Sequence, residues 1–180
     1  MKLDLHITAQ AVYLRAFKPS DAQKVFLMSV ESSMKKWIPD QVYDSVEHAS
    51  EVLAFLIRQY HAASSPHTVP VVLGICLAEN DELIGHVGVS PLREDVEIGY
   101  AIEEKEHGHG YATLAVQAMC EWASERYSLP CILGIVAAEN QASCRVLEKA
   151  GFNLKTEEMA QMHAQLRLVR RYEKQPVFGC

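Results

Sequence analysis

The chain has 180 residues, of which 49% are hydrophobic and 22% are charged, and its formal net charge is −6. A chain of this length can bury a substantial core, so we expect one globular domain over residues 1–180. The acidic balance argues against general affinity for nucleic acid or anionic membranes, and it favours a cationic partner or substrate. No apolar run is long enough to span a membrane, and residues 1–10 lack the apolar core of a signal peptide. We therefore expect a cytoplasmic protein without nucleic-acid or membrane partners.

Cysteine and histidine spacing bears on redox state and on metal binding. The chain has five cysteines, an odd number, and no C-x-x-C pair. Four of them lie in apolar segments, namely Cys76, Cys120, Cys131 and Cys144, and the fifth is Cys180. This usage predicts reduced, buried thiols. Because H-E-x-x-H and paired Cys/His spacings do not occur in the sequence, we expect no metal site.

Hydrophobic periodicity and turn residues divide the chain into alternating helices and strands. Strands are predicted at 11–17, 69–78, 83–89, 96–102, 131–137, 152–156 and 165–172. Helices are predicted at 19–31, 46–60 and 110–126, and at a short segment that ends at Lys149 and has Gly151 at its C-terminus. Residues 32–43 contain Trp37 and Pro39 and are predicted to form a loop, because proline interrupts helices.

The order of these elements indicates how the sheet is built. Residues 96–137 read as a strand, a helix and a strand, so these two strands should be parallel with a right-handed crossover. Short turns join the hairpins on either side, and those strands should pair antiparallel. We therefore expect an α/β (α+β) fold with a mixed, mostly antiparallel central sheet of about seven strands and helices on both faces.

The stretch from Val96 to Thr113 combines a strand, a Gly108-His109-Gly110 turn and the start of a helix. Glycines let the backbone approach a ligand closely, and the first N–H groups of a helix point outward at the positive end of its dipole. The stretch therefore suits a phosphate, although strand-to-helix turns also use glycine for geometry alone. A Walker A loop is excluded because Tyr111 rather than lysine follows Gly110, and a dinucleotide-binding fold would need more parallel strands.

Five motifs, in order, make the chain resemble a known family. They are Leu14-Arg15 before a capped helix, Trp37-Ile38-Pro39, Glu97-Ile98-Gly99-Tyr100, His107-Gly108-His109-Gly110-Tyr111-Ala112-Thr113, and Asn140-Gln141-Ala142-Ser143 leading to Val146-Leu147-Glu148-Lys149-Ala150-Gly151-Phe152. With these motifs the chain resembles the GCN5-related N-acetyltransferase (GNAT) superfamily, and within it the branch typified by acetylases of ribosomal-protein N-termini. The resemblance runs over residues 13–172, nearly the whole chain. It implies the acyl-CoA acyltransferase fold of that family and acetyl-CoA as the cosubstrate.

The resemblance also implies which residues bind acetyl-CoA. The family's pyrophosphate loop, which binds through backbone N–H groups, corresponds to His107, Gly108, His109, Gly110, Tyr111 and Ala112. The strand edge from Tyr100 to Ile102 should pair with the pantetheine amides as an added strand would. Asn140 corresponds to an asparagine that also holds pantetheine, and Ser143 to a hydroxyl residue near the thioester sulfur. The acidic residues 103, 104 and 106 are unexpected beside a phosphate site.

Direct acetyl transfer, which the resemblance implies, needs a base for the acceptor amine and an acid for the leaving thiolate. Glu97 is the candidate base, because alternation along the strand places it with the slim Gly99 on the face opposite the bulky residues. A solvated or ion-paired carboxylate is the structural alternative, in which case water or another carboxylate such as Glu157 or Glu158 would serve. Ser143 is the candidate acid, and the alternative is that its hydroxyl caps the following helix.

The sequence thus predicts an acetyl-CoA-dependent N-acetyltransferase that acts on a primary amine. Trp37 and Tyr43 are candidate walls of the acceptor pocket, and packing under the helices is the alternative for both. The branch resemblance suggests a peptide or protein N-terminus as the acceptor, with a small amine or amino acid as the competing substrate. A member that binds acyl-CoA without turnover is the alternative from a different class. The sequence leaves open whether the chain forms a homodimer.

Overall fold

The computed structural model of the chain describes residues 5–60 and 64–175. An eight-stranded sheet has the order β1-β2-β3-β4-β5-β6-β8-β7. Its strands are β1 (His6–Ala9), β2 (Val12–Arg15), β3 (Val71–Leu77), β4 (Leu83–Leu92), β5 (Asp95–Ile102), β6 (Ile132–Ala137), β7 (Asn153–Met162) and β8 (Gln165–Lys174). The α-helices are α1 (Ala22–Ser29), α2 (Ser32–Trp37), α3 (Val46–Gln59), α4 (Tyr111–Tyr127) and α5 (Gln141–Lys149), with short 3-10 turns η1 (Pro19–Asp21), η2 (Pro39–Gln41) and η3 (Glu104–Glu106).

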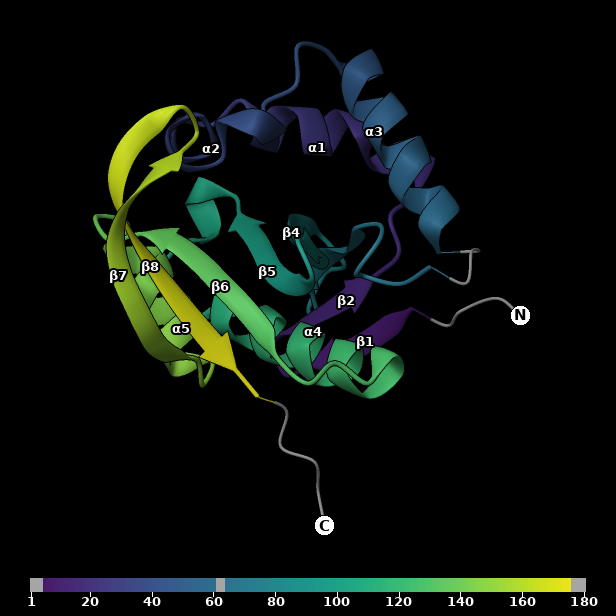
Figure 1. The fold of residues 1–180 in the computed structure, drawn as a ribbon. Coiled ribbons are helices and arrows are strands. Elements are labelled where there is room, and N and C mark those ends of the chain that lie inside the picture. The colour runs from purple at the N-terminus through teal and green to yellow at the C-terminus, as the bar shows by residue number, and fades with distance from the viewer. Residues whose placement is uncertain (1–4, 61–63, 176–180) are drawn as a thin grey trace.

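Helices cover both faces of the sheet, as the sequence predicts (Figure 1). On one face, α1 and α3 pack around a small core that includes Phe17 and Leu53. On the other face, α4 and α5 bury a larger core in which Met119 and Leu147 are almost fully covered. Each face of the sheet therefore has an apolar layer of its own, and burial of these side chains is the main force that holds the helices in place.

The predicted strand–helix–strand unit is confirmed, because β5 and β6 are parallel and α4 connects them. β5 pairs with β4 along its whole length, from Leu92–Asp95 to Gly85–Ile102. With β6 it shares the single register pair Glu97–Leu133. The two parallel strands therefore diverge after Glu97, and this divergence leaves one edge of β5 without a strand partner.

Three elements differ from the sequence prediction. β1 adds a strand at the edge of the sheet, which thus has one strand more than predicted. Helix α2 and turn η2 occupy most of the segment predicted to be a loop, and Pro39 begins η2, where a missing N–H costs nothing. β7 extends as far as Met162, because its pairing with β8 continues to Met162–Gln165.

The thiols partly follow the prediction of buried cysteines. Cys76, Cys120 and Cys144 are buried, whereas Cys131 is half-buried, and all four are free. Cys180 lies outside the described residues. Among the helices of the described residues, none has the length and apolar character needed to cross a membrane.

Candidate active site

A cleft of about 820 Å³ lies where β5 and β6 diverge. The glycine turn before α4 and the first turns of α5 form one part of its wall, and α2, η2 and the tip of the β7–β8 hairpin form another. Most residues predicted for the site line this cleft, namely Trp37, Glu97, Tyr100, Ile102, His107, Gly108, Gly110, Tyr111, Ala112, Asn140 and Ser143. The structure therefore brings motifs that are distant in sequence together in one cleft. Two predicted residues, His109 and Tyr43, do not line it.

The glycine turn presents bare backbone at one part of the cleft. Gly108 and Gly110 have φ angles of 84° and 81°, in the left-handed region that other residues avoid. A Cβ atom added at either position would meet no other atom within 4 Å, so open space lies beside the backbone. No side chain caps the N-terminus of α4, which starts at Tyr111, and its first N–H groups are available to a ligand. Such a turn fits a pyrophosphate group.

The two histidines of the turn are held by hydrogen bonds to the backbone. His107 Nε2 donates to the Ile102 carbonyl oxygen at 2.7 Å, and His109 Nδ1 donates to the Glu106 carbonyl oxygen at 3.3 Å. The His109 ring also stacks on Tyr111, with ring centroids 5.4 Å apart. Both histidines therefore fix the conformation of the turn. The Ile102 carbonyl already has one partner, which leaves its second lone pair for the predicted pairing with pantetheine.

Two of the three acidic residues beside the turn, Glu103 and Glu104, are occupied by contacts within the protein. Glu103 is 5% exposed and forms ion pairs with Lys24 at 2.6 Å and Lys105 at 3.3 Å. Glu104 accepts a hydrogen bond from Ser33 N at 2.7 Å, at the start of α2. A carboxylate is stabilised at a helix N-terminus by the helix dipole. These two charges therefore hold η3 against α1 and α2, which accounts for the acidic residues at these two positions.

The first turn of α5 shows which residue caps this helix, and the cap is not the Ser143 hydroxyl. The N-cap of α5 is Asn140, whose Oδ1 accepts a hydrogen bond from Ser143 N at 3.2 Å. The interpretation of the Ser143 hydroxyl as the helix cap is therefore wrong, since Ser143 gives only its backbone N–H to the cap. Asparagine and serine are both favoured N-caps, so residue type alone does not distinguish them.

The Ser143 hydroxyl instead contacts the opposite wall of the cleft. Tyr100 Oη lies 2.7 Å from Ser143 Oγ and 3.1 Å from the Ser143 carbonyl oxygen. Burial raises the pKa of Tyr100 to about 12, so its hydroxyl keeps its proton at neutral pH. This contact joins β5 to α5 across the gap between the diverging strands.

Glu97 lies at the point where β5 and β6 begin to diverge, on the face that strand alternation predicts. Val96 and Ile98 point into the core under α4, and Gly99 is exposed. Burial raises the pKa of the Glu97 carboxyl above its usual value. Among the described residues no hydrogen bond or ion pair engages this carboxylate, so it is not the ion-paired strand-end residue of the structural alternative.

The other carboxylates considered for the base lie outside the cleft. Glu157 on β7 forms an ion pair with Arg170, and Glu158 is exposed on the same strand. Neither residue lines the cleft, whereas Glu97 does. Glu97 is therefore the better placed of the three to contact a substrate.

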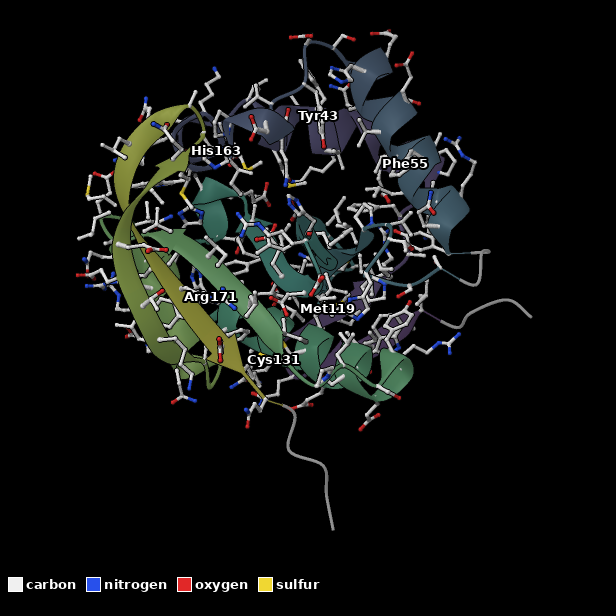
Figure 2. All side chains as sticks on the ribbon, viewed as in Figure 1. Tyr43, Phe55, Met119, Cys131, His163 and Arg171 are labelled. Carbon is white, nitrogen blue, oxygen red and sulfur yellow. The ribbon has the colours of Figure 1, made fainter. Side chains whose placement is uncertain are left out.

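One part of the cleft, where Trp37 is the predicted acceptor wall, is lined by α2, η2 and the β7–β8 hairpin. Trp37 lines it, and the Arg167 guanidinium lies 5.8 Å from the centroid of that ring. His163, at the tip of the hairpin (Figure 2), pairs with Asp40 on η2, with Nδ1 2.8 Å from Oδ2. Tyr43 lines an adjoining cavity of about 20 Å³, which has room for a single water-sized group.

Two basic residues of α5 line the cleft although neither of them was predicted from the sequence to have a role in the site. Arg145 and Lys149 line it from α5, and their spacing of four residues puts them on one face of the helix. The spacing of four residues between two basic side chains, on the helix that follows Asn140, is the sequence pattern that could have identified these two residues. Their charges favour an anionic ligand at this wall. In the described part of the chain, no group of histidine, cysteine or carboxylate side chains is arranged to hold a metal ion.

Sequence comparisons place the chain among acetyltransferases. The family described as "Acetyltransferase (GNAT) domain" matches residues 11–153. The "Uncharacterized N-acetyltransferase YnaD" of Bacillus subtilis (strain 168) is 28% identical over 149 residues, which cover 82% of each chain. The "Probable N-acetyltransferase YjcK" of the same organism is 36% identical over 84 residues, covering 44% of this chain and 46% of that protein.

Solved structures share the fold at low sequence identity. RimL, described as a ribosomal L7/L12 alpha-N-protein acetyltransferase in complex with coenzyme A, has a TM-score of 0.80 at 17% identity, covering 95% of this chain and 98% of that chain. The ribosomal-protein-S5-alanine acetyltransferase of Vibrio fischeri has a TM-score of 0.81 at 18% identity, covering 97% and 98%. Since the family match at residues 11–153 spans most of the chain and contains the glycine turn, Glu97 and Ser143, this chain belongs to the GNAT family and is an N-acetyltransferase of that type.

Proposed function

We propose that the chain transfers the acetyl group of acetyl-CoA directly to the α-amine of a peptide or protein N-terminus. The main observation in favour of acetyl-CoA as the cosubstrate is the connection between β5 and α4, where glycines with positive φ and an uncapped helix N-terminus face the cleft. The GNAT family uses acetyl-CoA, and an elongated cosubstrate needs a site that continues beyond its phosphates. The cleft does so, running on past Tyr100 and Ser143 to the walls of α2 and η2.

Each part of the cosubstrate has a matching group in the cleft. The backbone N–H groups of the glycine turn suit the pyrophosphate, and Arg145 and Lys149 add positive charge beside it. The edge of β5 that has no partner strand after Glu97 can pair with the pantetheine amides. When it is bound there, acetyl-CoA supplies an acetyl group activated as a thioester.

Glu97 and Ser143 are the residues proposed to handle protons. A carboxylate with a pKa raised by burial is a stronger base than a solvated one, so Glu97 can accept the proton that the acceptor amine must lose. The Ser143 hydroxyl lies on the opposite wall and is not used by the helix cap, so it can donate to the departing sulfur. Both residues contact the cleft in which the reaction takes place.

The acceptor is inferred from charge and from the structural neighbours. Glu97 places a carboxylate without a partner among the described residues in the cleft, which favours an ammonium group as the incoming substrate. Two of the neighbours are described as acetyltransferases of ribosomal proteins, one of them as an alpha-N-protein acetyltransferase, and their fold covers nearly the whole chain. An N-terminal segment fits a cleft that continues beyond its reacting end, because residues after the α-amine can contact the walls near Trp37.

A panel of amines tests this proposal. Coenzyme A release is followed with peptides that begin with serine or alanine, with the same peptides blocked at the α-amine but carrying a lysine, and with free amino acids and small amines. We expect kcat/KM for the free peptides to exceed that for the matching amino acids by roughly tenfold or more, because contacts beyond the amine contribute to transition-state binding. Faster turnover of a small amine would assign a small-molecule acceptor. Binding of acetyl-CoA without turnover of any amine would identify a binding module instead.

A further inference from the structure

We infer that Tyr100 is a positioning residue for the acid step: its phenol orients the Ser143 hydroxyl and replaces the proton that Ser143 gives to the departing thiolate. This inference rests on the proposed function, in which Ser143 is the acid. It adds a role for a side chain otherwise assigned only through the backbone of its strand.

The position of Tyr100 makes this contact possible. It lies three residues beyond Glu97, the position at which β5 and β6 share their register pair, so no neighbouring strand separates it from α5. Its side chain lies on the α4 side of the sheet and packs against the main core, and its hydroxyl reaches the first turn of α5. Tyr100 and Ser143 both line the cleft. The hydroxyl pair is therefore held from two rigid elements beside the path of the cosubstrate.

The hydrogen atoms of the two hydroxyls allow two arrangements. If Tyr100 donates to the Ser143 carbonyl at 3.1 Å, then Ser143 must donate to Tyr100 across the 2.7 Å contact, and no hydrogen is left for the sulfur. If Tyr100 donates across the 2.7 Å contact instead, the Ser143 hydrogen is free to point into the cleft. Only the second arrangement makes Ser143 an acid, and it requires the tyrosine hydroxyl.

The relay also lowers the energy of the proton transfer. An aliphatic hydroxyl that protonates a thiolate on its own would be left as an alkoxide, a far stronger base than a phenolate. A phenol has an ordinary pKa of about 10, and a thiol one of about 8.5. Burial raises the pKa of Tyr100 to about 12, which keeps the relay fully protonated between turnovers. The negative charge then falls on the most stable of the available oxygens.

The proton balance of the step closes through solvent water. The sulfur gains the Ser143 proton as the carbon–sulfur bond breaks, and Ser143 Oγ regains a proton from Tyr100 Oη. The resulting phenolate takes a proton from water, which reaches it through the cleft once coenzyme A has left, and the hydroxide formed is neutralised by the amine proton that Glu97 releases to solvent. Serine, tyrosine and glutamate all return to their starting protonation states.

The test compares Tyr100→Phe, Ser143→Ala and the double variant, each of which removes only hydroxyl groups. The helix cap survives in Ser143→Ala, because it uses the backbone N–H of that residue. Tyr13→Phe is the matched control, because Tyr13 lies on β2, away from the cleft. Its hydroxyl donates a hydrogen bond to Asp81 at 3.1 Å, and burial raises its pKa to about 12, as it does for Tyr100. The measurements are kcat from coenzyme A release at saturating substrates and the dissociation constant of acetyl-CoA by calorimetry.

We expect Tyr100→Phe to lower kcat by roughly tenfold or more while the dissociation constant of acetyl-CoA stays within about twofold. The double variant should be no slower than Ser143→Ala, because residues that act as one unit are not additive. Normal kcat in Tyr100→Phe with reduced kcat in Ser143→Ala overturns the relay and leaves the proposed function intact. Additive losses overturn it too, since the two hydroxyls would then act independently. A wild-type protein that turns over no amine overturns both proposals.

Discussion

Glu97 places a carboxylate in a cleft where burial favours its protonated form. The folded protein therefore holds this proton to higher pH than the unfolded chain does. It follows that the stability contributed by protonated Glu97 is fully present below the pKa of the unfolded chain and is lost as the pH rises through the raised pKa. Activity follows the opposite trend, because a base must be deprotonated before it can accept the proton of the amine. One residue thus links a loss of stability to a gain in rate over the same range of pH.

Glu97→Gln separates these two effects. The amide keeps the shape of the side chain but cannot accept the proton, so kcat/KM should fall by roughly 10²-fold and the rise of the rate on the acid side of the pH profile should flatten. The free energy of unfolding at neutral pH should stay equal or increase, because a buried charge has been removed. Glu158→Gln, on an exposed part of β7, is the control. An unchanged pH profile in Glu97→Gln, with or without a change in stability, would show that Glu97 is not the base.

At the residue scale, the sequence predicts positions that depend on local periodicity. Alternation along β5 correctly puts Val96 and Ile98 in the core and exposes Gly99. The contact between Tyr100 and Ser143 could not be predicted in this way, because the two residues are 43 positions apart and meet only where β5 and β6 diverge. That divergence is a property of strand pairing, which has no signature in the residues of either strand.

At the scale of elements, the turn between η3 and α4 joins two regular segments by a backbone that only glycine adopts readily. Gly108 and Gly110 share this conformation with Gly151, which follows the C-terminus of α5. The same positive φ favours glycine at all three positions, yet only the first two of these glycines line the cleft. This difference allows the effect of backbone strain to be separated from the effect on a ligand.

Gly108→Ala and Gly110→Ala should each reduce stability by about 1 kcal/mol, the cost of a left-handed residue that has a Cβ atom. Both should weaken acetyl-CoA binding by roughly tenfold or more, because the new methyl group occupies the open space that the pyrophosphate needs. Gly151→Ala should show a similar loss of stability and normal binding. Thermal unfolding and calorimetry measure the two quantities. Equal affinity in all three variants would remove the turn from the binding site.

Elements with strong apolar periodicity are the ones that the sequence predicts. The helices α3 and α4 and the strands β3 to β6 could be predicted from the sequence, because each of them buries one or both faces. β7 was predicted too short, since nearly all of its residues are exposed and its polar sequence has no alternation. α2 was missed because only Met34 is buried among its six residues, so it lacks an apolar stripe. These short or exposed elements line the part of the cleft where we propose that the acceptor binds.

At the scale of the whole molecule, the cleft is bounded by segments far apart in the chain. The tip of the β7–β8 hairpin arches toward α2 (Figure 1), and His163 meets Asp40 there, 123 positions away in sequence. Arg167 lies over Trp37 beside this contact. The fold class and the strand–helix–strand unit follow from the order of elements, but this contact follows from the length and curvature of the hairpin. Neither the length nor the curvature of this hairpin can be predicted from short stretches of sequence.

The hydrogen-bonded pair of His163 and Asp40 should matter for the acceptor rather than for global stability. Asp40→Ala and His163→Ala should each raise KM for the acceptor by roughly threefold to tenfold and leave acetyl-CoA affinity unchanged, because the pair joins the two walls of the acceptor part alone. The free energy of unfolding should fall by no more than about 1 kcal/mol, as for other surface pairs. The double variant should resemble either single variant, since both remove one interaction. Arg171→Gln is the control. It breaks the ion pair between Arg171 and Asp95, whose charged atoms are 3.7 Å apart, and because this pair lies away from the two walls, KM should stay unchanged. If the control raises KM as much as the other variants do, the effect belongs to the surface charge of the protein and not to closure of the acceptor walls.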